Sequence, residues 1–274
     1  MNEGKIVNLE EKDKKDLIKE FNKRGYLLED KMISILSRRL STFNNLYKNP
    51  IGIEYGRRNN GERIEIDAIV EIGDKTFVLD AKRTEYDWIF SSSIERPNNA
   101  INVVYIHPKE GYVSQPMIID SSLGFLNVVY HDFAIKFGEN KLIRGRGEKI
   151  SLPEVNRPIH DAIRQILKES KAVLLEGSKY MSAGKFLIPI IVTNARLLYL
   201  DFKDSQIDEQ GNLTDWNSLK EVKAVGYNFH ESFSFNTEQG FHSSRPENIV
   251  KTAFIVNINH LKETIEYLSG LHII

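Results

Sequence analysis

Two aspartates and a lysine lie in one short segment, and their types and spacing would suit the binding of a metal ion. They are Asp67, Asp80 and Lys82, within residues 62–83, which read ERIEIDAIVEIGDKTFVLDAKR. The segment consists of two alternating runs of β-branched and aromatic residues that meet at Gly73-Asp74, a pair typical of a two-residue turn. We therefore predict a β-hairpin here.

A two-residue turn fixes which residues of a hairpin face each other. The predicted pairs are Ile72 with Lys75, Asp67 with Asp80, and Glu65 with Lys82. Because side chains alternate along a strand, Glu65, Asp67, Asp80 and Lys82 are expected to project from one face. The other face is apolar and is expected to be buried. It consists of Ile64, Ile66, Ala68, Val70, Phe77, Leu79 and Ala81.

The predicted pairing of Asp67 with Asp80 is destabilising, because two directly opposed carboxylates repel each other. A divalent cation would offset the repulsion, since Mg²⁺ is held by one or two carboxylates together with water and phosphate oxygens. Lys82 would lie beside such a cation, where it would orient water or stabilise a developing negative charge. The alternative is a charged hairpin face that is simply exposed to solvent.

The elements around the hairpin are expected to form an α/β (α+β) fold, with a central mixed β-sheet flanked by helices. Apolar spacing predicts helices at 9–24, 28–43, 86–94, after Asn156, and at 259–269. Strands are predicted at 51–55, 101–107, 126–130, 133–137, 171–176, 186–192, 196–202 and 254–258. The run FLIPIIV at 186–192 is almost wholly apolar, which indicates a strand covered on both faces.

Glu29 is a third carboxylate of interest. It lies on the apolar line of the second predicted helix, together with Ile33, Leu36 and Leu40. A carboxylate on a buried edge needs a partner. The alternative explanation is that an acidic residue in the first turn complements the helix dipole.

Three segments, GYLLEDKM (25–32), EIDAIV (65–70) and LDAKR (79–83), resemble the PD-(D/E)XK nuclease superfamily, most closely restriction-endonuclease-like proteins of the Mrr kind. The resemblance covers roughly residues 20–137. It implies a restriction-endonuclease-like core with a C-terminal α/β extension or second domain. The sequence departs from the family pattern in having Ile66 instead of proline before Asp67, and Asp80 instead of the more usual glutamate.

The resemblance implies an Mg²⁺-dependent endonuclease that hydrolyses phosphodiester bonds, with Mn²⁺ as a substitute metal. Glu29, Asp67, Asp80 and the backbone carbonyl of Ala81 would bind the metal, and Lys82 would position the attacking water. Glu65 would be either an accessory ligand or a salt-bridge partner of Lys82. Candidate phosphate contacts are Arg57, Arg58, Arg83, Arg144 and Arg146.

DNA is favoured over RNA as the substrate, in restriction, defence or repair, and a homodimer is expected because such enzymes often cut two strands. The competing hypothesis is a catalytically inactive protein of the same fold that binds nucleic acid or a partner protein. A metal-dependent enzyme that hydrolyses another small substrate is a third alternative.

Composition narrows the classes of function. With 27% charged residues and a net charge of −1, the chain is typical of soluble globular proteins and has no overall positive field for nucleic acid. The absence of cysteine excludes disulfides, zinc–thiolate sites and cysteine nucleophiles, and fits a cytoplasmic protein. No apolar run is long enough to span a membrane. The predicted units are a nuclease-like domain at 1–140 and a C-terminal α/β unit at 150–274, joined by a polar linker at 138–150. The second unit is either a recognition or dimerisation domain or a continuation of the same sheet.

Overall fold

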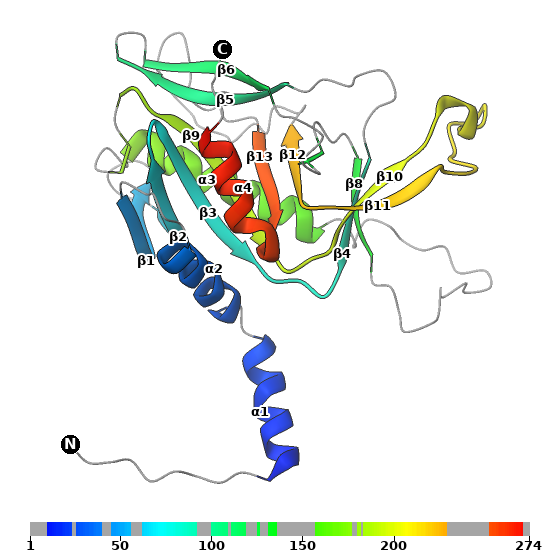
Figure 1. Cartoon of the computed structure of the whole chain (residues 1–274), viewed down its shortest axis with the longest axis horizontal. Coiled ribbons are helices and arrows are strands. Elements are labelled where there is room, and N and C mark those ends of the chain that lie inside the picture. Colours follow the sequence, from blue (N-terminus) through cyan, green and yellow to red (C-terminus); the bar gives the residue numbers. More distant parts are fainter. Residues whose placement is uncertain are drawn as a thin grey trace.

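The computed structural model (Figure 1) describes most of the chain, and the structural statements below concern only the described residues. These are residues 10–23, 26–39, 45–55, 62–91, 100–108, 111–118, 125–126, 131–135, 157–176, 180–181, 183–228 and 252–270.

The described residues form helices and strands in an order close to the predicted one. The helices are α1 (Glu11–Lys23), α2 (Tyr26–Arg39), α3 (Arg157–Glu176) and α4 (Leu261–Gly270), with short 3-10 turns η3 (Asp204–Gln206) and η5 (Ile258–His260). The strands of the N-terminal half are β1 (Asn45–Tyr55), β2 (Glu62–Ile72), β3 (Lys75–Lys82), β4 (Asp87–Ser91), β5 (Ala100–His107), β6 (Gly111–Ile118), β7 (Phe125–Leu126) and β8 (His131–Ile135). Those of the C-terminal half are β9 (Phe186–Thr193), β10 (Leu197–Asp201), β11 (Ser218–Val222), β12 (Ala224–Asn228) and β13 (Thr252–Asn257).

A nine-stranded sheet forms the centre of the fold. Its main path runs β1-β2-β3-β9-β13-β12-β7, and β5 pairs with β9 and with β6 beside this path. Strands β1, β2 and β3 pair antiparallel, whereas β3, β9 and β13 pair parallel, so the sheet is mixed. A second sheet has the order β11-β10-β4-β8. The predicted fold class, a mixed sheet flanked by helices, is confirmed.

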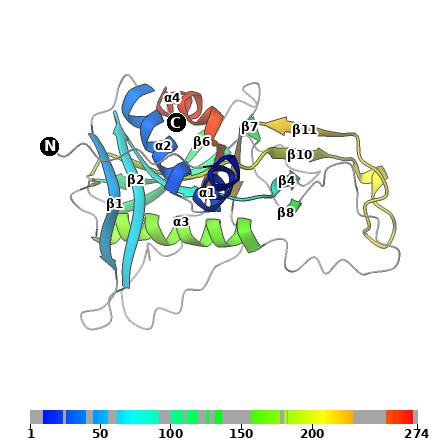
Figure 2. The same ribbon diagram turned by 90° about the horizontal axis from the view of Figure 1, so that it is seen from below.

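Helices cover both faces of the central sheet, with α3 on one side and α2 and α4 on the other (Figure 2). The apolar face of α3, including Ile163 and Ile166, packs into one buried cluster of side chains. Met32 of α2 and Ile265 of α4 belong to a second cluster on the opposite face. This double covering explains why β9 is almost entirely apolar, as its sequence predicts.

Both halves of the chain contribute strands to the central sheet. Strand β3, from the first half, pairs along its whole length with β9 from the second half, from Lys75 opposite Phe186 to Lys82 opposite Thr193. Strands β9, β13 and β12 of the second half therefore continue the sheet that holds the hairpin, whereas β10 and β11 belong to the second sheet. The division into two domains stays a prediction. The predicted linker at 138–150 lies outside the described residues.

Two predicted elements are wrong. The expected helix at 86–94 is strand β4, in which Trp88 and Phe90 are buried and the strand is held between β8 and β10. The expected strand at 171–176 is the last part of α3. Short apolar runs fit a buried strand and a buried helix equally well by pattern. Pairing with β8 and β10 holds the first as a strand, whereas the second continues α3.

No described helix combines the length and the apolar character that are needed to cross a membrane.

Candidate functional site

The hairpin of β2 and β3 has the predicted turn and register. Gly73 takes the left-handed backbone conformation, with φ of +57°, which glycine adopts readily in a two-residue turn. The paired residues run from Ile72 opposite Lys75 to Ala68 opposite Leu79. One further step along this register would bring Asp67 opposite Asp80, but the ladder ends at Ala68.

Asp67 marks the point where the two strands separate. Its Oδ2 accepts a hydrogen bond of 2.7 Å from the backbone N–H of Ala81, so a side chain replaces the next rung of the ladder. The alternation of β2 also changes phase here. Ala68 and Val70 are buried in the cluster beside α2 and α4, whereas Ile66 packs in the cluster beside α3.

The predicted single apolar face is therefore wrong for its first two members, Ile64 and Ile66, which belong to the cluster beside α3. Strand β1 shifts its register against β2 in the same region, between Lys48 and Ile51. A register shift of this kind re-aims side chains locally. It lets Asp67 reach across toward β3.

Asp80 is almost wholly buried, with 1% of its surface exposed, and its carboxylate is held by Lys82. The Nζ atom of Lys82 lies 3.0 Å from Oδ1 and 2.8 Å from Oδ2 of Asp80. The lysine side chain is only 27% exposed, so this ion pair is largely shielded from solvent. Asp80 and Lys82 thus form the paired centre of the site.

Glu65 does not pair with Lys82, and the predicted salt bridge between them is wrong. The Oε1 atom of Glu65 instead lies 3.8 Å from Nε of Arg63, and both side chains are exposed. The phase change at Asp67 explains the difference, because residues before it no longer share the face of the residues after it.

Glu29, in the first turn of α2, lies in electrostatic range of the hairpin. Its partial burial and the charge of Asp67 raise its pKa, while Lys82 acts in the opposite direction. The structure thus brings the predicted helical acid near Asp67 and Lys82.

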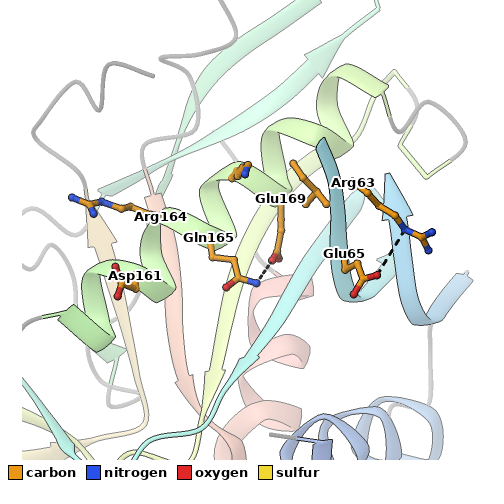
Figure 3. Close-up of a pocket in the computed structure, with 8 residues that line it drawn as sticks. Arg63, Glu65, Asp161, Arg164, Gln165 and Glu169 are labelled. Carbon is orange, nitrogen blue, oxygen red and sulfur yellow. Dashed lines mark hydrogen bonds and ion pairs between the residues drawn. The ribbon is translucent and has the colours of Figure 1, made fainter. Parts of the chain in front are cut away.

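A fourth carboxyl group, Glu169 of α3, was not predicted. It is 1% exposed, and its Oε1 accepts a hydrogen bond of 2.8 Å from Nε2 of Gln165 (Figure 3). The same amide nitrogen lies 3.3 Å from Oδ1 of Asp80 and donates to it. Gln165 therefore links the carboxyl groups of two distant segments.

A sequence signal for Glu169 existed. The residue lies three positions after Ile166 and seven after Ala162, so it falls on the apolar face of the helix, the same pattern that singled out Glu29.

These four carboxyl groups, Glu29, Asp67, Asp80 and Glu169, together with Lys82, are called the acidic site below. Burial is the largest cause of a raised pKa in each of the four acids, and neighbouring carboxylates add to it. Burial raises the pKa of Asp80 to about 7 despite the opposing charge of Lys82. The pKa of Glu169 is raised well above its usual value by burial and by the charge of Asp80. Lys82 acts in the opposite direction and lowers the pKa of all four acids.

The acids do not converge on one point in the structure. Across the part of the chain that is described, no three or more His, Cys, Asp or Glu side chains are grouped closely enough to hold a metal ion. The oxygens of Asp67 and Asp80 are turned toward the Ala81 N–H and the Lys82 ammonium respectively. Metal binding would require Lys82 to give up part of its contact with Asp80.

Of the predicted phosphate contacts, Arg83 is the one that the structure describes. Arg83 follows β3 directly and is exposed. The other four candidate phosphate contacts lie outside the described residues; they are Arg57, Arg58, Arg144 and Arg146.

Comparison with family models, with curated proteins and with solved structures found no match to this chain.

Proposed function

We propose that this protein is a metal-dependent nuclease that hydrolyses phosphodiester bonds, with Mg²⁺ or Mn²⁺ at the acidic site. The observation that carries the proposal is the buried Asp80 carboxylate, which contacts Lys82 and is linked through Gln165 to the buried Glu169. Asp67 and Glu29 lie within electrostatic range of the same lysine. A purely structural site would be expected to balance its buried charges more closely.

The donor set fits a hard divalent cation. Carboxylate oxygens are the ligands that Mg²⁺ prefers, and the Oε2 atom of Glu169 is buried with no hydrogen-bond partner among the described residues. We propose Glu29, Asp67, Asp80 and the carbonyl of Ala81 as ligands, as the family resemblance implies, with Glu169 as a further candidate. When bound, the metal would supply charge neutralisation and water activation.

The residues of the chain would contribute orientation and charge. Gln165 holds the carboxyl groups of Asp80 and Glu169 in place through its amide N–H donors. Lys82, released from Asp80 in part, would donate to the attacking water or to a phosphate oxygen. The Ala81 N–H donates to Oδ2 of Asp67 and so fixes the position of this carboxylate.

The proposed substrate is DNA, and a homodimer would allow two strands to be cut. The direct test is to incubate purified protein with plasmid, linear DNA and RNA, each with Mg²⁺, Mn²⁺ or EDTA. We expect metal-dependent cleavage by the wild type, and none by Asp80→Asn or Lys82→Met.

The matched control is Asp87→Asn, which removes an aspartate that pairs with Arg196 at 2.7 Å at the start of β4. This variant should cut like the wild type. Equal inertness of the wild type and all variants on every substrate would rule out the nuclease proposal, and Mn²⁺ binding measured by calorimetry would show whether the metal site exists without activity.

A second candidate function is binding without cutting. It is favoured by the direct contact of Lys82 with both oxygens of Asp80. Because of this contact, the oxygens that would bind a metal are already engaged by the lysine. In that case nucleic acid or a partner protein would bind equally well in EDTA, and binding would survive Asp80→Asn.

A further inference from the structure

A groove runs beside the acidic site, between the start of β2 and one side of α3. It has a volume of about 520 Å³ and is lined by Arg63, Ile64, Glu65, Asp161, Arg164, Gln165, Lys168 and Glu169. Figure 3 shows Gln165 and Glu169 pointing from α3 in the same direction, with Arg63 and Glu65 across from them. Gln165 and Glu169 thus belong both to the groove and to the acidic site.

We propose that this groove binds one nucleotide of an unpaired nucleic-acid strand, next to the phosphodiester that the acidic site would cut. The inference rests on the proposed function and names its substrate class. Arg164 and Lys168 on α3 contact the phosphate of this nucleotide, and Arg63 on β2 lies on the facing wall.

The size of the groove argues for an unpaired strand. Pockets of about 300–1,000 Å³ hold single ligands of drug-like size, and a nucleotide belongs to that class. A duplex is wider than its own major groove of about 12 Å, so a segment of duplex is larger than a space of this volume, whereas one unpaired nucleotide is not. The innermost acids, Asp80 and Glu169, are each 1% exposed, and a strand reaches them more readily when it is not held in a stack of base pairs.

The charges of the groove argue for a local phosphate contact. Arg164 and Lys168 are four residues apart and therefore lie on the same side of α3. Three acids also line the groove, namely Glu65, Asp161 and Glu169, so the groove is not a continuous basic surface of the kind that attracts duplex DNA over many phosphates. Binding here depends on a few contacts and on the cation at the neighbouring acidic site.

The test measures binding directly, so that its result does not depend on cutting. A fluorescent single-stranded oligonucleotide and the same sequence in a blunt duplex are titrated with full-length protein, with Ca²⁺ and with EDTA, and followed by anisotropy. The variants are Arg164→Glu and Lys168→Glu, with Lys168→Gln as a milder change. Lys220→Glu is the matched control, because Lys220 is an exposed cation on β11 in the second sheet.

We expect the single strand to bind at least about tenfold more tightly than the duplex. Each charge reversal should weaken single-strand binding by about tenfold, and the slope of log affinity against log salt should fall by about 0.7 for each phosphate that the variant no longer neutralises. Lys220→Glu should bind like the wild type. Circular dichroism establishes that the variants are folded.

Absence of single-strand binding, equal binding of duplex, or single-strand affinity unchanged in both reversal variants would overturn the inference. Those results would leave the nuclease proposal standing if plasmid is still cut. Conversely, single-strand binding that depends on Arg164 and Lys168, without any cleavage, would support the inference about the groove and contradict the nuclease proposal.

Discussion

Asp80 and Asp132 are two buried aspartates beside α3, and their surroundings differ in kind. Asp132, on β8, is 9% exposed and accepts a hydrogen bond of 2.8 Å from the hydroxyl of Tyr227, with Nε2 of His160 at 3.3 Å. Asp80 is 1% exposed and contacts Lys82 and Gln165. The neighbours of Asp132 are donors, whereas those of Asp80 include other carboxyl groups.

The difference shows that burial of a carboxylate does not by itself indicate function. One aspartate, whose Oδ1 contacts a tyrosine and a histidine, links β8, β12 and α3. Asp80 instead lies in electrostatic range of Asp67, Glu29 and Glu169, with Lys82 as the cation that acts on all four.

The largest expected effect is the loss of cleavage activity on substitution of Asp80, which is not expected on substitution of Asp132. Asp80→Ala should lower the rate of DNA cleavage by about a thousandfold or more, because the reacting centre is deprived of a ligand. Its stability should be unchanged or higher, since the carboxylate that is removed repels its neighbours. Initial rates on plasmid and urea unfolding curves measure the two effects.

Asp132→Ala should keep the wild-type cleavage rate per folded molecule and should lose stability. If Asp132→Ala were inactive while it remained folded, or if Asp80→Ala cut at the wild-type rate, the comparison would be wrong.

The next effect is the pH dependence of stability without metal. Burial raises the pKa of Asp80 from its usual 3.8 to about 7, so the folded state takes up this proton more readily than the unfolded state. The resulting stabilisation is complete below pH 3.8 and is lost as the pH rises to about 7. Each pKa unit corresponds to about 1.4 kcal/mol.

The free energy of unfolding in EDTA should therefore fall between pH 4 and 7, and this part of the fall should be absent in Asp80→Asn. Urea titrations at unit steps of pH measure it. A wild-type profile that coincides with the Asp80→Asn profile would show that Asp80 does not titrate in this range.

A divalent cation should stabilise the folded protein by binding at the acidic site. At a concentration one hundred times its dissociation constant, the gain is about 2.7 kcal/mol. Thermal unfolding with and without Mg²⁺ should show this gain in the wild type and in Asp132→Ala. A gain of the same size in Asp80→Ala would place the ion elsewhere.

The smallest expected effect is the stability loss in Asp132→Ala, about 1–3 kcal/mol, because the buried hydroxyl of Tyr227 loses its acceptor. Tyr227→Phe removes one donor and should cost less, about 1 kcal/mol. Chemical unfolding of both variants measures the difference. A loss in Tyr227→Phe that exceeds the loss in Asp132→Ala would contradict this account.

The hairpin could be predicted from the sequence because its signals are local. A glycine turn and alternating residues determine the pairing from Ile72 to Ala68, and the apolar run of β9 indicates a strand covered on both faces. Glu29 could be singled out for the same reason, since its position on an apolar helix face is visible within one element.

Other features depend on elements far apart in the chain, which the sequence pattern does not bring together. The phase change of β2 at Asp67 depends on the register shift of β1 and on the Ala81 N–H. Glu169 reaches Asp80 only because α3 packs against the sheet formed by β3 and β9, and no local pattern specifies that packing.

The parallel pairing of β3 with β9 determines the stage of synthesis at which the acidic site can form. Lys75 pairs with Phe186, a residue that leaves the ribosome more than a hundred residues later, and α3 with Glu169 is synthesised in between. Pairing between such distant segments is slow to form, because a long loop must close first. A nascent chain that ends before β9 therefore carries Asp67 and Asp80 without the strand that supports them, and the acidic site is completed only late in synthesis.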